Sequence, residues 1–212
     1  MTHSSVPTFS VVIFTKNRPQ LAGFALESVL RQSFGDFEVI ICDNDDGEST
    51  RRAMSRYQDK RIRYHRTGGL SMVDNWECGL SLATGHFVVS LTDRSVLKRN
   101  ALERVRRAIR EHGEDVYVWE FDLLIQWRDG DDVIPYTGPR GDHVLSSRSL
   151  LDLFLKNPYD TYEHRLPRSL NSCCSSDLLR EIRASTGGHV CLPVAPDFTL
   201  AFMTLVHTPS VV

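Results

Sequence analysis

Four short apolar runs divide the first 97 residues of the chain. Each run is rich in β-branched or aromatic residues and is bounded by proline, glycine or polar residues, which is typical of a buried strand. The runs read FSVVIFT, FEVIIC, IRYH and HFVVSL. The pattern therefore predicts strands over residues 9–15, 37–42, 62–65 and 86–91.

The segments between these strands have the periodicity of helices. The first begins at Pro19, because the fixed φ and missing N–H of proline suit the first turn of a helix. Further helices are expected around 49–57 and over 71–83. Strands that alternate with helices in this way imply βαβ units. The predicted fold class is α/β, with a central, mostly parallel sheet flanked by helices. The expected apolar face of the first helix consists of Leu21, Phe24, Ala25, Val29 and Leu30.

The second half of the chain has a less regular pattern. An apolar, aromatic run over 116–127 predicts one long strand that continues into a hairpin through RDGDD. The segment 171–183 predicts the end of a strand followed by a helix with a serine cap. Helical spacing predicts further helices over 100–111, 149–155 and 196–206.

Polar side chains follow three of the predicted strands, at the point where each strand ends. They occupy Thr15–Asn17, Asp43–Asp46 and Thr92–Ser95. In open α/β sheets, ligands bind beyond the carboxyl ends of the strands. A polar loop alone is an ordinary surface feature, but three on one edge of a sheet predict a binding site.

Composition and charge exclude several classes of protein. The formal net charge is -2 and the pI is near 6.4, so we expect no nucleic-acid partner. No apolar run approaches the length of a membrane span, and the N-terminus lacks the pattern of a signal peptide. The five cysteines form no CxxC pair, and Cys42 and Cys78 lie in apolar patterns, so we expect buried thiols and a cytoplasmic protein. The histidines show no metal-binding spacing.

Two longer stretches resemble a known family. SVVIFTKNRPQLAGFALESVLRQSFGDFEVIICDND is similar to the N-terminal half of the family 2 glycosyltransferases, which have the GT-A fold. Their typical pattern is a strand, then T-x-N-R-P, a helix ending S-V-L-x-Q-(S/T)-F, a D-F-E strand and an acidic loop. DNWECGLSLATGHFVVSLTD resembles the next block, which leads to the DxD motif. The resemblance is close over 9–97 and collinear to about residue 206.

The resemblance implies an inverting transferase that uses a nucleotide-diphosphate sugar. Residues 1–97 would then bind the donor, and residues 98–212 would shape the cleft for a sugar or lipid-linked acceptor, within a single domain. Family members usually continue beyond the last helix, so whether the chain ends naturally at HTPSVV stays open. A homodimer also stays open.

Each motif residue then has an expected role at the donor. Thr15 would lie at the nucleobase through its backbone, and Asn17 and Arg18 complete the T-x-N-R-P motif in the same site. Asp43 and Asn44 would hydrogen-bond the base. An amide at position 44, where the family often has a second Asp, still offers a donor and an acceptor to a uracil-like edge. The donor would therefore be linked to UDP or dTDP.

The DxD position departs from the family. Asp93 falls on the first Asp of the motif, which helps to hold the ribose and the metal, but Arg94 and Ser95 replace the usual carboxylates. Three interpretations stay open. Asp93 alone could recruit Mg²⁺ or Mn²⁺ through water, or Arg94 could supply the metal's charge at the diphosphate. Alternatively, the site is degraded and the chain is a non-catalytic nucleotide-sugar-binding paralogue.

The expected general base is Asp197, in PVAPDFTLAF. The family places an acid shortly before its last conserved helix, and inverting transfer needs a base for the acceptor hydroxyl. The alternative is a simple helix cap, since Asp is favoured at helix starts. A basic cluster elsewhere is either a solvated helix face or a contact for anionic lipid at the inner face of the membrane or for an anionic acceptor. It comprises Arg51, Arg52, Arg56, Lys60, Arg61, Arg63 and Arg66.

Overall fold

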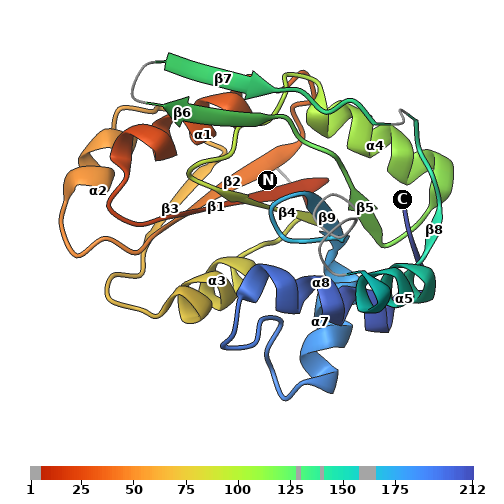
Figure 1. The fold of residues 1–212 in the computed structure, drawn as a ribbon. Helices are drawn as coiled ribbons and strands as arrows, with labels where there is room; N and C mark the ends of the chain where they lie inside the picture. The colour runs from red at the N-terminus through yellow and green to blue at the C-terminus, as the bar shows by residue number, and fades with distance from the viewer. Residues whose placement is uncertain (1–5, 128–129, 139–140, 158–165) are drawn as a thin grey trace.

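A six-stranded sheet forms the centre of the molecule, with strand order β3-β2-β1-β4-β9-β5 (Figure 1). The computed structural model describes residues 6–127, 130–138, 141–157 and 166–212. Four strands come from the first half of the chain and two from the second, so both halves build one sheet. The strands are β1 (Phe9–Thr15), β2 (Phe37–Asp43), β3 (Ile62–Arg66), β4 (Phe87–Thr92), β5 (Val116–Val118) and β9 (Ser172–Ser175).

The four strands of the first half run parallel, and their register aligns their carboxyl ends. Thr15 of β1 lies opposite Asp43 of β2, and Phe14 lies opposite Thr92 of β4. β9 is antiparallel to both β4 and β5. The predicted α/β class with a mostly parallel sheet is therefore confirmed, and the polar strand ends meet at one edge.

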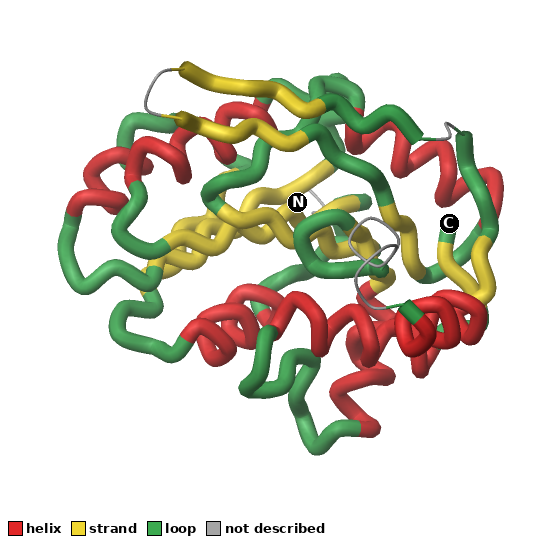
Figure 2. Tube along the Cα trace, viewed as in Figure 1, coloured by secondary structure: helices red, strands yellow, loops and turns green. Residues whose placement is uncertain are grey.

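Helices cover both faces of the sheet, so the domain has three layers (Figures 1 and 2). Side chains alternate along β1. Val11 and Ile13 pack on the side of α1, α2 and α4, whereas Val12 and Phe14 pack on the side of α3, α5, α7 and α8. The helices are α1 (Pro19–Leu30), α2 (Ser49–Met54), α3 (Met72–Ser81), α4 (Ala101–His112), α5 (Ser147–Lys156), α7 (Ser176–Ser185) and α8 (Pro196–His207). No helix among the described residues is long and apolar enough to span a membrane.

The buried face of α1 differs from the predicted one. Leu21 and Phe24 are 36% and 61% exposed, while Ala22, Gly23 and Leu26 are buried. A Cβ on Gly23 would lie 3.2 Å from the Tyr57 hydroxyl, so the small residues allow close packing. The prediction for Leu21 and Phe24 was wrong because this close packing, rather than side-chain size, decides which face is buried.

The predicted long strand over 116–127 is two separate strands. β5 stops at Val118, and β6 (Leu123–Trp127) pairs with β7 (Gly130–Ile134) as the expected hairpin. The backbone N–H of Trp119 donates to Asn171 at the point where the chain leaves the sheet. The run breaks there because its neighbour β9 is only four residues long. A further short pair joins β8 (Leu145–Ser146) to β10 (Ser210–Val211).

The cysteines follow the prediction in part. All five are free, and Cys42 is fully buried, whereas Cys78 is only partly buried. Burial raises the pKa of Cys42 to about 12, so its thiol is unreactive at neutral pH.

Candidate active site

Asp93 lies at the junction of the ends of β1 and β4. Its carboxylate is buried, with a side-chain exposure of 4%. The Thr15 hydroxyl donates to Oδ2 at 3.0 Å, and Arg18 Nη1 lies 3.3 Å from Oδ1. Asn17, between these two partners, has a φ of 57°, which turns the chain back over the strand ends. The structure thus brings four of the predicted donor-site residues together.

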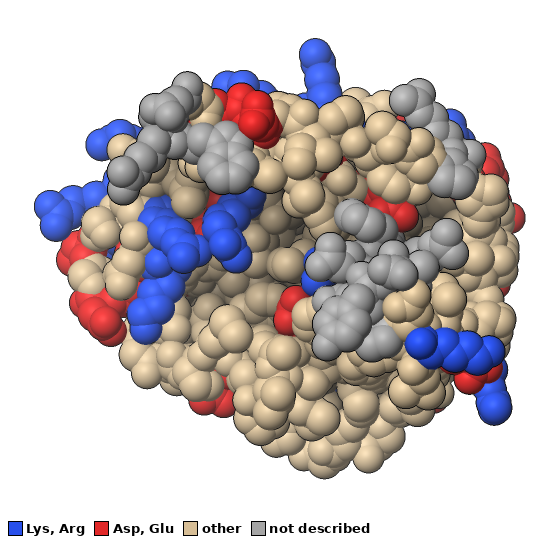
Figure 3. Space-filling view, in the orientation of Figure 1, with Lys and Arg blue, Asp and Glu red and all other residues tan. Residues whose placement is uncertain are grey.

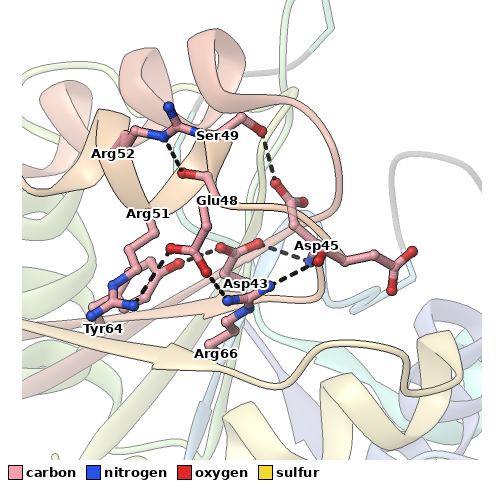
Figure 4. A network of polar contacts seen from close by, with 9 residues as sticks. Asp43, Asp45, Glu48, Ser49, Arg51, Arg52, Tyr64 and Arg66 are labelled. Carbon is pink, nitrogen blue, oxygen red and sulfur yellow. Dashed lines mark hydrogen bonds and ion pairs between the residues drawn. The ribbon is translucent and has the colours of Figure 1, made fainter.

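A second buried carboxylate, Asp43, ends β2. It is fully buried, and it accepts from the Tyr64 hydroxyl and from the backbone N–H of Asp45, the latter at 2.9 Å (Figure 4). Burial raises the pKa of Asp43 above its usual value, against the effect of these two hydrogen bonds. Burial and the neighbouring Asp43 also raise the pKa of Tyr64. A buried carboxylate with a raised pKa at a strand end is typical of a functional site.

Asp45 links the loop that follows β2 to the loop that follows β1. It is fully buried and accepts from the Thr50 hydroxyl at 2.6 Å and from the backbone N–H of Asn17. Burial alone would raise its pKa, but hydrogen bonds from Thr50, Asn17 and their neighbours lower it. Asp45 therefore holds the T-x-N-R-P turn in place. Sequence reasoning missed this role, since three acids of the same loop offer no pattern that separates them.

The Asn44 side chain makes hydrogen bonds within the protein. Its Nδ2 donates to the Leu70 carbonyl at 2.8 Å, and its Oδ1 accepts from the Leu70 N–H at 3.0 Å. Leu70 follows Gly68 and Gly69, whose positive φ values of 33° and 75° suit glycine. The amide thus anchors this turn to the end of β2. Its role at the base stays a prediction.

Most of the predicted basic cluster is paired with acids of the same chain. Glu48 lies between Arg51 and Arg66 (Figure 4). Arg61 pairs with Asp59 at 2.7 Å and Arg63 with Glu38 at 2.6 Å. These pairs favour the interpretation of the cluster as a solvated surface. In the orientation of Figure 1, Figure 3 shows Lys and Arg side chains gathered beside a hollow on the face toward the viewer.

Asp197 is the second residue of α8 and is half-buried. The N-cap position belongs to Ala195, which has a φ of 45°, and no side chain caps this helix. The carboxylate of Asp197 has no hydrogen-bond partner within the described residues. Asp197 is therefore not the N-cap residue, although an acid in the first turn of a helix also suits the helix dipole.

Two charged residues that sequence reasoning missed surround the start of α8. The Glu77 carboxylate of α3 accepts from the backbone N–H groups of Val190 and Cys191, and it lies 3.6 Å from Arg183. These contacts tie the loop before Asp197 to the first half of the chain. The Arg168 guanidinium lies 5.1 Å from the centre of the ring of Phe198, the residue that follows Asp197 in the chain. Glu77 lies within the stretch DNWECGLSLATG but not at one of its motif positions, and Arg168 lies in no recognisable motif, so no local signal identified either residue.

The residues around Asp93 do not fit a divalent ion. Mg²⁺ and Mn²⁺ take oxygen ligands, whereas here a guanidinium lies against one carboxylate oxygen and a hydroxyl donor against the other. The next residue, Arg94, is exposed and offers no ligand. Among the described residues, the one cluster with metal-ligand geometry is an exposed group, Glu111, His112 and Asp142, which does not include Asp93.

A cavity of the described structure lies away from these carboxylates. It has a volume of about 380 Å³ and is lined by residues such as Thr84, Gly85, His86 and Asp177, at the amino ends of β4 and α7. The buried carboxylates and the polar strand ends lie at the opposite edge of the sheet. Because ligands of open α/β sheets bind at the carboxyl edge, we place the candidate active site there.

Comparisons with solved structures show which fold the chain has. The chain has the GT-A fold of nucleotide-sugar glycosyltransferases, as in TarS 1-349 from S. aureus, with a TM-score of 0.69 and 18% identity over 97% of this chain and 58% of that one. TarS 1-349 has also been solved in complex with UDP-GlcNAc. The mannosyltransferase PcManGT from Pyrobaculum calidifontis, solved with GDP-Man and Mn²⁺, has a TM-score of 0.65 and 13% identity over 99% of this chain and 55% of that one.

Residues 10–131 match the model of the family described as Glycosyl transferase family 2, and the chain belongs to that family. A curated relative is the PGL/p-HBAD biosynthesis glycosyltransferase of Mycobacterium bovis (strain BCG / Pasteur 1173P2). It is 30% identical over 112 residues, which cover 51% of this chain and 44% of the relative. The match covers less than half the length of the curated relatives, 44% of this one and 36% of a glucosyltransferase from Campylobacter jejuni.

Proposed function

We propose that this domain transfers a sugar from a nucleotide-diphosphate donor to a hydroxyl acceptor in the synthesis of a glycoconjugate or polysaccharide. One observation carries the proposal: Thr15 and Asp43 end β1 and β2, Asp93 directly follows the adjacent β4, and all three residues are buried at the carboxyl edge of the sheet. Membership of family 2 and the UDP-GlcNAc complex of TarS support the same conclusion.

The donor occupies this edge in the proposed complex. The backbone of Thr15 and the carboxylate of Asp43 bind the base of a uridine or thymidine nucleotide, with Asn44 holding the adjoining turn. Asn17 and the Asp93 carboxylate lie on the ribose side. Arg18 and Arg94 face the diphosphate, because a guanidinium matches the geometry of phosphate oxygens.

Asp197 acts as the general base of an inverting reaction. It accepts the proton of the acceptor hydroxyl while the oxygen attacks the anomeric carbon. The bond from that carbon to the diphosphate breaks, and the nucleoside diphosphate leaves with the electron pair. A positioned carboxylate contributes roughly 100- to 10,000-fold to such a step. The half-buried carboxylate of Asp197, in the first turn of α8 and with no hydrogen-bond partner within the described residues, supports this role.

Replacement of the base tests the proposal. Asp197→Asn should lower sugar transfer at least about 100-fold, with donor affinity unchanged within about twofold, because the base contacts the acceptor and not the nucleotide. A matched control is Asp177→Asn, an exposed acid in the first turn of α7. Transfer from UDP- and dTDP-sugars is measured by release of the nucleoside diphosphate. Full activity of Asp197→Asn, or equal loss of donor binding, would refute the role.

The second candidate is a nucleotide-sugar-binding protein without turnover. Arg94 favours it, since this residue occupies a place where the family has a metal-binding carboxylate. The same assay separates the two functions. Donor binding with no release of nucleoside diphosphate, in the presence of a panel of sugar and lipid-linked acceptors, would favour the binding protein. The proposal also includes contact of this domain with the membrane surface and the formation of a homodimer.

A further inference from the structure

The environment of Asp93 differs from that of a metal ligand. Its side chain is 4% exposed, and both oxygens already have partners: the Thr15 hydroxyl at 3.0 Å and Arg18 Nη1 at 3.3 Å. A cation bound to Oδ1 would meet the guanidinium at close range, and like charges at such a distance repel. The position that a metal would take is therefore held by Arg18.

Arg18 is placed to contact both Asp93 and a ligand. Its side chain is 50% exposed, although the carboxylate beneath it is buried. A single guanidinium nitrogen contacts Asp93, and the planar group carries five N–H donors in all. The remaining donors have no hydrogen-bond partner within the described residues, and their geometry matches the oxygens of a phosphate.

The helix that follows Arg18 also favours an anion. Arg18 is the N-cap residue of α1, a helix of 12 residues whose first turn contains no acidic residue and whose N-terminus has no side-chain cap. The first backbone N–H groups of a helix lack internal partners, and the helix dipole adds partial positive charge there. This helix end and the guanidinium therefore present positive charge at the same turn.

Arg94 adds a second guanidinium to the same region. It lies in the turn after β4, which is closed by the Ser95 N–H bonded to the Thr92 carbonyl at 3.0 Å. The side chain is exposed and has no ion-pair partner within the part of the chain described. It therefore remains available to a ligand, but no contact fixes its orientation as Asp93 fixes that of Arg18.

We propose that this site binds the diphosphate of its nucleotide through Arg18, with Arg94 beside it, and without a divalent metal ion. Asp93 is a positioning residue that holds the Arg18 guanidinium, not a metal ligand. The inference rests on the proposed function, since it presumes a nucleoside diphosphate at this edge. During transfer the guanidinium groups stabilise the negative charge that develops on the leaving diphosphate.

The test is titration calorimetry of UDP on the wild-type chain, first in chelator and then with Mn²⁺. We expect the same affinity within about twofold in both conditions, and a decrease with added salt because the contact is ionic and partly exposed. UDP binding that requires Mn²⁺ would overturn the inference while leaving the proposed function intact. If UDP and dTDP bind in neither condition, the donor assignment fails, and the inference fails with it.

Variants identify the residue responsible. Arg18→Ala should weaken the binding of UDP about 10- to 100-fold, since the lost contact is to phosphate. The affinity for uridine, measured by NMR titration, should stay nearly unchanged. Arg18→Lys should recover part of the loss, because an ammonium lacks the planar fork, and it also serves if the alanine variant is unstable. Arg94→Ala should have a smaller effect. Arg104→Ala, an exposed arginine on α4, is the control for a lost charge.

The variants can also contradict the inference directly. Equal losses of UDP and uridine in Arg18→Ala would show that Arg18 only supports the fold of the loop. Arg94→Asp rebuilds a second carboxylate beside Asp93 and should make UDP binding stronger with Mn²⁺ than without it. Mn²⁺ dependence in the wild type equal to that of Arg94→Asp would mean that Asp93 holds a metal after all.

Discussion

The two ends of strand β2 carry buried carboxylates in opposite environments. At the amino end, Glu38 accepts from the Ser10 hydroxyl at 2.6 Å and from Thr84, and it pairs with Arg63 at 2.6 Å. At the carboxyl end, Asp43 accepts from the Tyr64 hydroxyl and the Asp45 N–H, and no cation among the described residues pairs with it.

The pKa values of these two acids shift in opposite directions. Burial would raise the pKa of Glu38, but the hydrogen bonds of Ser10, Arg63 and Thr84 outweigh it, and the pKa is lowered. Burial raises the pKa of Asp43, and the nearby Asp45 charge adds to it. Glu38 is therefore stabilised as an anion by the protein alone. Asp43 is not, so a ligand that donates a hydrogen bond to it has more to contribute.

The largest expected effect is on ligand binding at the carboxyl end. Asp43→Ala should weaken a uridine or thymidine diphosphate about 10- to 100-fold, because a hydrogen bond to a charged group contributes roughly 1.5–3 kcal/mol. The rise in melting temperature that the nucleotide produces should largely disappear, measured against the variant's own baseline. If the melting temperature of the variant rises with nucleotide as that of the wild type does, Asp43 does not bind the base. The two ends of β2 would then not differ in function.

The next effect concerns stability at the amino end. Glu38→Ala removes the acceptor of the Ser10 hydroxyl and the ion-pair partner of Arg63, while the Thr84 N–H keeps Ser10 Oγ and Arg63 keeps the Leu82 carbonyl. The loss should cost about 1–3 kcal/mol in the free energy of unfolding. Urea denaturation measures this loss. Nucleotide affinity of the folded variant should stay within about twofold of the wild type. A tenfold loss of nucleotide affinity in Glu38→Ala, with an unchanged free energy of unfolding, would instead assign ligand binding to the amino end of β2.

The smallest effect is a difference in pH dependence. The pKa of Glu38 is lower in the folded state than in the unfolded state. Its contribution to stability is therefore complete at pH values above the unfolded-state pKa, and it is lost as the pH falls through the folded-state pKa. Glu38→Gln should therefore flatten the decline in stability between roughly pH 5 and pH 3. Asp43 has the opposite sign, because its raised pKa favours the folded state at low pH. Asp43→Asn should steepen the same decline, and identical curves for both variants would contradict the assigned shifts.

Much of the fold follows from local patterns. The apolar runs at 9–15, 37–42, 62–65 and 86–91 correspond to β1 to β4 within one or two residues. Burial on both faces of a parallel sheet requires continuous apolar strands, so the signal is strong and local. The positions of the polar loops directly after these strands were then enough to predict that the loops gather at one edge of the sheet.

Packing decided the elements that the sequence left ambiguous. The exposed Phe24 and the buried Gly23 on α1 reflect the close approach of Tyr57, which lies 34 residues further along the chain. The break after Val118 depends on the short neighbour β9, from a segment more than 50 residues away. Contacts between such distant segments leave no periodicity in either one.

The sequence by itself determined that Asp43, Asp93 and Arg18 belong to one polar edge, because strand ends and motif spacing are local properties of the chain. It did not determine what each charge contacts. Only the tertiary structure joined Arg63 to Glu38 and Arg18 to Asp93, and left Asp43 with no paired cation in the part of the chain that is described. The free energy of a charge depends on burial and on partners within a few ångströms. Those partners come from different strands and loops, so the role of each carboxylate is decided when the sheet assembles.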